Sequence, residues 1–237
     1  MVAARLTAVR ERIAAAARRA GRDPGTVRLV AVTKGVPAAV IAEAVAAGQT
    51  DFGENRAGEL TEKARLLAGH GAELSAAVRW HFVGHLQRNK VRRVRPLTAL
   101  LHSLDGVRLA RAWAGDGPAP PALIQVNVAG EAQKHGVAAE QAGALLAELD
   151  RLGIPAAGLM TIAPLRADPE AVRPVFAALA RLGDELRRAR DDLAELSMGM
   201  TDDFEVAVEE GATMLRIGRA IFGATQGPGT GPTATDR

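Results

Sequence analysis

The feature that most constrains the fold of this chain is an alternation, repeated eight times, of short apolar runs with segments of helical periodicity. Most of the runs are apolar on both faces, which is typical of strands in a parallel sheet covered by helices. We predict strands over residues 27–33, 50–53, 79–84, 99–103, 122–128, 157–161, 193–198 and 213–217. Eight β-α units in 237 residues predict a closed (β/α)8 barrel, the TIM barrel.

The segments between the strands carry helix signals. Leu6, Val9 and Ile13 lie on one face of a helix that precedes the first strand, so the barrel has an extra N-terminal helix. Asp168 followed by Pro169 predicts an N-cap and a first helical position. The alternative is an open doubly wound sheet, but that fold would usually carry a G-x-G-x-x-G fingerprint after its first strand. We therefore predict one barrel domain over residues 1–224 and a disordered Gly, Pro and Thr tail over 225–237.

Composition excludes several classes of protein. The chain has no cysteine, which excludes disulfides, thiol catalysis and cysteine-ligated metals. Its 30 basic and 27 acidic residues give a net charge of +3, weak evidence for a nucleic-acid partner, so the basic stretch at 88–95 is interpreted as a solvated helix face. No signal peptide or membrane span is visible, and we expect a cytoplasmic protein without a membrane partner. No histidines and carboxylates show metal spacing, so no metal site is predicted.

Lys34 is the most unusual polar residue, because it ends the first apolar run and is followed by Gly35. The carboxyl ends of barrel strands build the active site, where a desolvated lysine can act as an amine nucleophile. A loop lysine facing solvent fits its position equally well. At the eighth strand end, Gly218 precedes a short helix whose N–H groups favour an anion, and Ser197 can add a hydroxyl. A lysine facing a phosphate site suggests pyridoxal 5′-phosphate (PLP) or a phosphosugar aldehyde.

A set of motifs favours PLP over a phosphosugar aldehyde as the ligand. They are LVAVTK (29–34), FGEN (52–55), WHFVGHLQRNK (80–90), HSLD (102–105), KHG (134–136), GLMT (158–161), LSMGMTDD (196–203) and MLRIGRAIFG (214–223). Together, in this order, they resemble the pyridoxal phosphate homeostasis protein family, single-domain barrels of the alanine-racemase N-terminal-domain type. The resemblance runs from about residue 5 to residue 224.

The resemblance implies a role for each matching residue. Lys34 would form the Schiff base with the cofactor aldehyde, and Arg216 would lie near the pyridine nitrogen. The phosphate would be held by Ser197 with the backbone of Ile217 and Gly218, and the ring pocket would be lined by Asn55, His81 and Met198. The sequence departs from the commoner GPLQSNK pattern at His85 and Arg88, and Arg56 follows FGEN where an aromatic is frequent.

The same residues limit the expected chemistry. The pyridine ring is a strong electron sink when its nitrogen is protonated, and an arginine beside that nitrogen cannot accept its proton. The chain also has no tyrosine to serve as the second base of a racemase. We therefore expect a non-catalytic PLP carrier with PLP-dependent apo-enzymes as acceptors, and the resemblance implies a monomer. The alternatives are a PLP-dependent racemase-like enzyme and a Schiff-base aldolase acting on phosphosugars.

Overall fold

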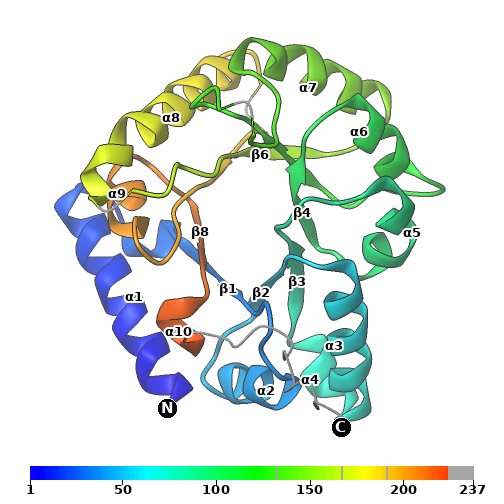
Figure 1. Cartoon of the computed structure of the whole chain (residues 1–237), viewed down its shortest axis with the longest axis vertical. Helices are drawn as coiled ribbons and strands as arrows, with labels where there is room; N and C mark the ends of the chain where they lie inside the picture. Colours follow the sequence, from blue (N-terminus) through cyan, green and yellow to red (C-terminus); the bar gives the residue numbers. More distant parts are fainter. Residues whose placement is uncertain (132, 167, 191, 224–237) are drawn as a thin grey trace, which may run out of the picture.

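Eight parallel strands close into a barrel in the computed structural model, which describes residues 1–131, 133–166, 168–190 and 192–223. Their order around the barrel is their order along the chain, and β1 pairs with β8 to close it (Figure 1). The strands are β1 (Arg28–Val32), β2 (Asp51–Glu54), β3 (Arg79–Phe82), β4 (Leu100–Leu104), β5 (Ala122–Gln125), β6 (Ala156–Met160), β7 (Glu195–Ser197) and β8 (Met214–Ile217). The predicted TIM barrel and all eight predicted strands are confirmed, with small shifts at their ends.

Helices form the outer ring in Figure 1. They are α1 (Val2–Arg19), α2 (Ala38–Ala46), α3 (Ala57–Gly69), α4 (Ala72–Ala76), α5 (Val91–Val94), α6 (Val107–Ala114), α7 (Ala142–Arg151), α8 (Arg173–Arg187), α9 (Phe204–Glu209) and α10 (Arg219–Phe222). The predicted cap is confirmed: the Asp168 carboxylate accepts a hydrogen bond from the Glu170 N–H, and Pro169 begins a 3-10 turn that leads into α8.

Helix α1 is the predicted extra helix, and it completes the ring between α2 and α9. Its apolar face, with Leu6, Val9 and Ile13, is buried. Arg12 forms an exposed ion pair with Glu205 of α9, which adds little to the free energy of folding. Burial of the apolar face, rather than this pair, therefore holds α1 on the barrel.

The barrel interior is divided into an apolar part and a polar part. Leu100, Leu123, Met160 and Met214 form a separate apolar cluster. Beside it lies a buried polar group that comprises Asp51, His81, His102, Ser197 and Arg216. Because buried polar atoms are costly without partners, this half of the interior must be fully hydrogen-bonded to be stable.

The predicted C-terminal tail falls outside this description. The tail predicted to be disordered, residues 225–237, lies beyond the described residues, so the proposed domain limits stay a prediction. Among the helices that the structure describes, none combines the length and the apolar character needed to span a bilayer.

Candidate functional site

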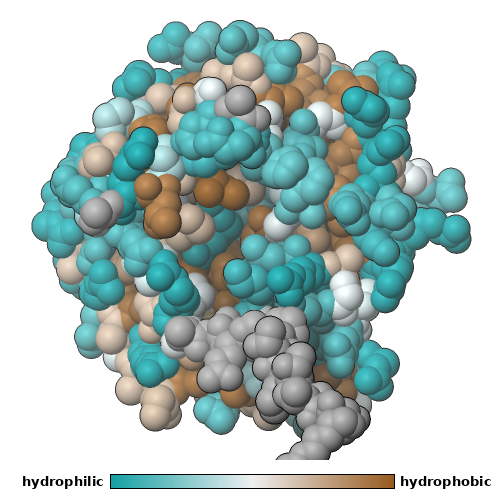
Figure 2. Space-filling model, in the orientation of Figure 1, coloured by the Kyte–Doolittle hydropathy of each residue, from teal (hydrophilic) through white to brown (hydrophobic). Residues whose placement is uncertain are grey.

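A cavity of about 470 Å³ opens at the carboxyl ends of the strands. The first three strands and the loops after them contribute Val32, Lys34, Val36, Asn55 and Val83 to its lining. The remaining lining comes from the second half of the barrel: Lys134, residues 162–166, residues 200–203, Arg216, Gly218 and Arg219. Hydrophobic residues are visible near the centre of the molecule in Figure 2, among hydrophilic ones. The cavity thus combines an apolar wall with several cationic groups.

A tight turn presents Lys34 at the cavity. The Val36 N–H donates to the Thr33 carbonyl across the turn, and Gly35 adopts a φ of 69°, a conformation that favours glycine. The Glu59 carboxylate accepts from the Gly35 N–H at 2.8 Å, which fixes the turn from behind. The Lys34 side chain is exposed and forms no hydrogen bond or ion pair with the residues that the structure describes. Its amine is therefore accessible from the cavity.

A buried ion pair supports this turn from the outer side of the barrel. Lys63 of α3 pairs with Glu54 at the end of β2, and its ammonium also donates to the Thr33 carbonyl at 2.6 Å. Burial raises the pKa of Glu54, although the Lys63 charge opposes this shift. Breaking a buried pair by removing one partner is strongly destabilising. The end of β1 is thus held by charged groups that do not face the cavity.

Arg216 enters the cavity from the barrel interior, where it is almost fully buried. It donates from Nη1 to the Ser197 hydroxyl at 2.6 Å and from Nη2 to the Thr161 carbonyl at 2.8 Å. Burial lowers its pKa to about 10, while the nearby Asp203 carboxylate opposes that shift. The guanidinium remains charged at neutral pH and keeps further N–H groups for a ligand.

Behind Arg216, a continuous line of hydrogen bonds crosses the barrel. Ser197 Oγ lies 2.8 Å from His102 Nδ1, His102 Nε2 lies 2.9 Å from His81 Nδ1, and His81 Nε2 lies 2.9 Å from Asp51 Oδ1. Two neutral histidines, each with its proton on Nε2, satisfy every link, with donation running from Arg216 to the Asp51 carboxylate. The line therefore fixes Ser197, and through it the guanidinium.

The ionisation of His102 and of Asp51 agrees with that arrangement. Burial lowers the pKa of His102 well below the usual value of 6.5, and the proximity of His81 and Arg216 adds to the effect. Burial alone would raise the pKa of Asp51, but hydrogen bonds from His81 and Thr50 outweigh it and hold the pKa below its usual value. His102 is therefore neutral and Asp51 ionised around neutral pH.

Two further predicted residues lie at the cavity. Asn55 follows β2, and its Oδ1 is buried without a hydrogen-bond partner among the described residues. A buried unpaired acceptor is costly, so a ligand donor at this point would relieve a real penalty. Gly218 lies so close to β1 that a Cβ there would come within 2.9 Å of the Val32 carbonyl oxygen. Only glycine fits without moving the backbone.

The other four predicted residues do not line the cavity. His81 and Ser197 are fully buried in the hydrogen-bonded line below it, where Arg216 and the histidines already use their polar atoms. Met198 and Ile217 pack in the core between the barrel and the helices. The reason is strand geometry, because successive side chains alternate between the interior and the outer face. Their side chains therefore do not line the cavity, and their roles in cofactor binding stay predictions.

Sequence reasoning missed several cavity residues in the loops. Thr201 and Asp203 follow β7, Arg219 begins α10 and pairs with Asp202, and Lys134 comes from the loop after β5. The polar residues that follow Ser197 in the LSMGMTDD motif were a signal that this loop could reach the cavity. Because β7 ends at Ser197, residues 200–203 reach the rim and Ser197 does not.

Comparison with known proteins identifies the class first. Residues 4–226 match the alanine racemase N-terminal domain family, so the chain belongs to this family of barrels. The more specific relatives are pyridoxal phosphate homeostasis proteins, at 43% identity in Aquifex aeolicus (92% of this chain, 96% of the relative) and 42% in Pseudomonas aeruginosa (94% and 95%). The chain belongs to the pyridoxal phosphate homeostasis protein family, as the motif resemblance predicted.

Solved structures agree with this placement. The PLP-bound structure of PipY from Synechococcus elongatus superposes with a TM-score of 0.77 at 34% identity, covering 94% of this chain and all (100%) of that one. Alanine racemase from Corynebacterium glutamicum superposes at 0.64 with 18% identity, and the match covers 95% of this chain and 63% of that one. The second likeness shows the fold alone.

Proposed function

We propose that this protein binds PLP at the cavity and serves in PLP homeostasis. The observation that carries the proposal is the exposed amine of Lys34 in the same cavity as the buried guanidinium of Arg216. Lys34 would hold the cofactor covalently as a Schiff base, the expected bond between a lysine amine and an aldehyde. Family membership and the PLP bound to PipY support the same ligand.

The remaining polar groups fit such a ligand. Arg216, which lines the same cavity as Lys34, is assigned to the pyridine nitrogen, while Asn55 supplies its unpaired oxygen to the ring substituents. The backbone at Ile217 and Gly218, with Thr201 and Arg219, is assigned to the phosphate, because a close-approaching glycine and a cation suit an anion. Ser197 and His81 are assigned a supporting role through Arg216.

We further propose that turnover is small or absent. When bound, PLP withdraws electrons from an attached amino acid most strongly if its ring nitrogen is protonated. Arg216 can donate a hydrogen bond there but has no proton-accepting group, and it already donates to the Ser197 hydroxyl and the Thr161 carbonyl. The 237 residues also include no tyrosine. The chain's own residues thus support holding and release rather than proton transfer at an amino-acid Cα.

The test of binding compares two lysines in one cavity. Wild-type protein incubated with PLP should show a visible absorption band that borohydride reduction removes, with the pyridoxyl group on Lys34 by peptide mapping. Lys34→Ala should abolish the band. Lys134→Ala, which removes the other cavity lysine, should keep it, as should Lys90→Ala outside the cavity. A band that survives in Lys34→Ala contradicts the proposed anchor.

The test of turnover uses the same preparations. Racemisation and transamination of a panel of amino acids should stay near the rate of free PLP. An ordinary enzymatic rate, of the order of 1–1000 per second and lost in Lys34→Ala, would replace the carrier by the racemase-like alternative. Transfer to apo-enzymes, a monomeric state and a cytoplasmic location stay predictions, to be checked by reconstitution assays, light scattering and fractionation.

A further inference from the structure

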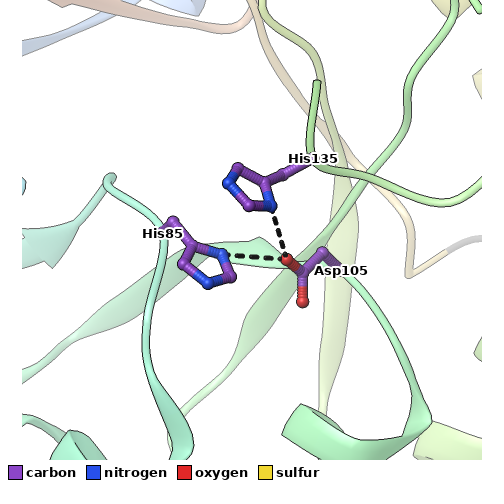
Figure 3. A group of neighbouring side chains, drawn as sticks. All are labelled: His85, Asp105 and His135. Atoms are coloured by element: carbon purple, nitrogen blue, oxygen red, sulfur yellow. Dashed lines mark hydrogen bonds and ion pairs between the residues drawn. The ribbon is translucent and has the colours of Figure 1, made fainter. Parts of the chain in front are cut away.

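Three polar side chains outside the cofactor cavity converge at the rim of the barrel. His85 follows β3, Asp105 follows β4, and His135 lies in the loop after β5. One ligand atom from each lies within 4.8 Å of the other two. Figure 3 shows both rings directed at the same oxygen of Asp105. None of the three residues lines the cavity that holds Lys34.

The separations suit a small cation. His85 Nδ1 lies 3.1 Å and His135 Nδ1 lies 3.9 Å from Asp105 Oδ2. Around a tetrahedral zinc ion with bonds of about 2.0–2.1 Å, ligand atoms are about 3.4 Å apart, between these two values. A shift of a few tenths of an ångström in each ring would therefore bring its Nδ1 to the distance from Asp105 Oδ2 that a shared ion requires.

The chemistry of the three groups narrows the choice of cation. Two imidazoles and one carboxylate suit zinc, cobalt, nickel or copper rather than magnesium or calcium, which prefer oxygen ligands alone. The two rings stack with centroids 3.9 Å apart and planes 12° apart, so one ring must rotate for both Nδ1 lone pairs to point at the same ion. Three protein ligands leave a fourth position open, as in metal sites that keep a water molecule.

The sequence predicted no metal site because the three residues show no ligand spacing. They are 20 and 30 positions apart, on three different loops, and only the closed barrel brings those loops together. His85 is also one of the positions where the chain departs from the commoner family pattern, which has proline there. Without a side chain able to bind metal at 85, the cluster would be reduced to one histidine and one carboxylate.

We propose that His85, Asp105 and His135 bind one divalent transition-metal ion, with zinc as the reference case. The ion would tie the loop after β3 to the loop after β5. The second loop is already held by the Gln125 amide, which donates to the His135 carbonyl at 3.0 Å. It also carries Lys134 into the neighbouring cavity. The metal would therefore fix the position of a cavity wall without contacting a ligand inside it.

The test measures metal binding directly and needs no cofactor. Tag-free, chelator-treated protein at about pH 8, where imidazole ligands are neutral, is titrated with zinc by calorimetry and with cobalt by visible absorption. We expect one equivalent to bind and cobalt to show the intense absorption of a four-coordinate site. His85→Ala and His135→Ala should each weaken binding more than about 100-fold, since loss of an outer-shell partner alone costs 10–100-fold.

His70→Ala is the matched control, because His70 is an exposed histidine at the end of α3, outside the cluster. It should bind zinc as the wild type does. Binding that is absent in the wild type, or that His85→Ala leaves unchanged, overturns the proposal. Circular dichroism of each variant separates loss of a ligand from loss of the fold. Because none of these readouts involves PLP, the proposal can fail while the proposed function holds, and the reverse.

Discussion

The protein contains two pairs of neighbouring histidines that differ in almost every physical respect. His81 and His102 are fully buried in the barrel, with ring centroids 5.1 Å apart in an edge-on arrangement. All four of their ring nitrogens lie in a line of hydrogen bonds between Asp51 and Arg216. His85 and His135 are exposed at the rim, stacked at 3.9 Å, and share one carboxylate.

The difference shows that burial decides what a pair of histidines can do. Inside the barrel, each nitrogen must have a partner, so the histidines are fixed in one tautomer and hold Arg216. At the rim, water can satisfy any nitrogen, so the rings are free to exchange a proton or a water molecule for a metal ion. The first pair is thus structural for the proposed PLP site, and the second is accessible to the metal ion proposed above.

The largest effect should come from removing a buried histidine. His81→Leu leaves the Asp51 carboxylate without its main buried partner and should lower the free energy of unfolding by about 3–5 kcal/mol. Urea unfolding at neutral pH measures this. His135→Leu at the rim should change it by less than about 0.5 kcal/mol. Equal losses in the two variants would show that enclosure does not distinguish the pairs.

A smaller loss should follow from removing one hydroxyl in the buried line. Ser197→Ala leaves Arg216 Nη1 and His102 Nδ1 without their shared partner, at a cost of about 1–3 kcal/mol. If PLP binds as proposed, its affinity should fall as well, because Arg216 is no longer held. Ser103→Ala is the matched control: Ser103 Oγ is also buried but has no hydrogen-bond partner among the described residues, so its loss should be neutral.

The pH dependence of stability should also distinguish the pairs. The pKa of His102 is lowered in the folded state, so below about pH 6.5 the unfolded chain binds a proton that the folded chain rejects. The free energy of unfolding should therefore decrease as pH falls through this range, by at most about 1.4 kcal/mol per pH unit. His102→Asn should show a shallower slope, whereas the His85→Ala/His135→Ala double variant should keep it. Comparing slopes cancels contributions from other groups.

The smallest effect is expected for His85→Ala in metal-free protein. Its ring is partly exposed and its hydrogen bond to Asp105 competes with water, so the free energy of unfolding should change by less than about 0.5 kcal/mol. Adding zinc should then stabilise the wild type and leave His85→Ala unchanged, in the same thermal unfolding assay. Stabilisation of both would place the metal elsewhere.

The sequence predicted the fold well because the spacing of apolar residues reflects which faces of each element are buried. Each strand is apolar on the face against the helices, and eight such runs leave a closed barrel as the simplest arrangement. Lys34 could be found in the same way, since a charge at the end of an apolar run is conspicuous. Asn55, Arg216 and Gly218 likewise follow or end strands, and the structure places all three at the cavity with Lys34.

The sequence could not predict how deep a polar side chain lies in the barrel or to which side of a strand it points. Ser197 and His81 are polar and lie in strands that lead to the cavity, but both lie one layer below it. Met198 and Ile217 are next to interior residues and therefore point outward. The rim cluster depends on three loops whose approach is decided by closure of the whole barrel. Such distances are set by tertiary structure rather than by local pattern.

The pairing of the first strand with the last has a consequence for the synthesis of this protein. Lys34 extends β1 and Arg216 lies in β8, where it is in register with Val30 of β1. A ribosome produces Lys34 early and Arg216 only after about 180 further residues. Any ligand that requires both groups can be captured only after β8 has left the exit tunnel and closed the ring. Chains cut short before β8 lack Arg216 and the closed ring, so they cannot sequester such a ligand.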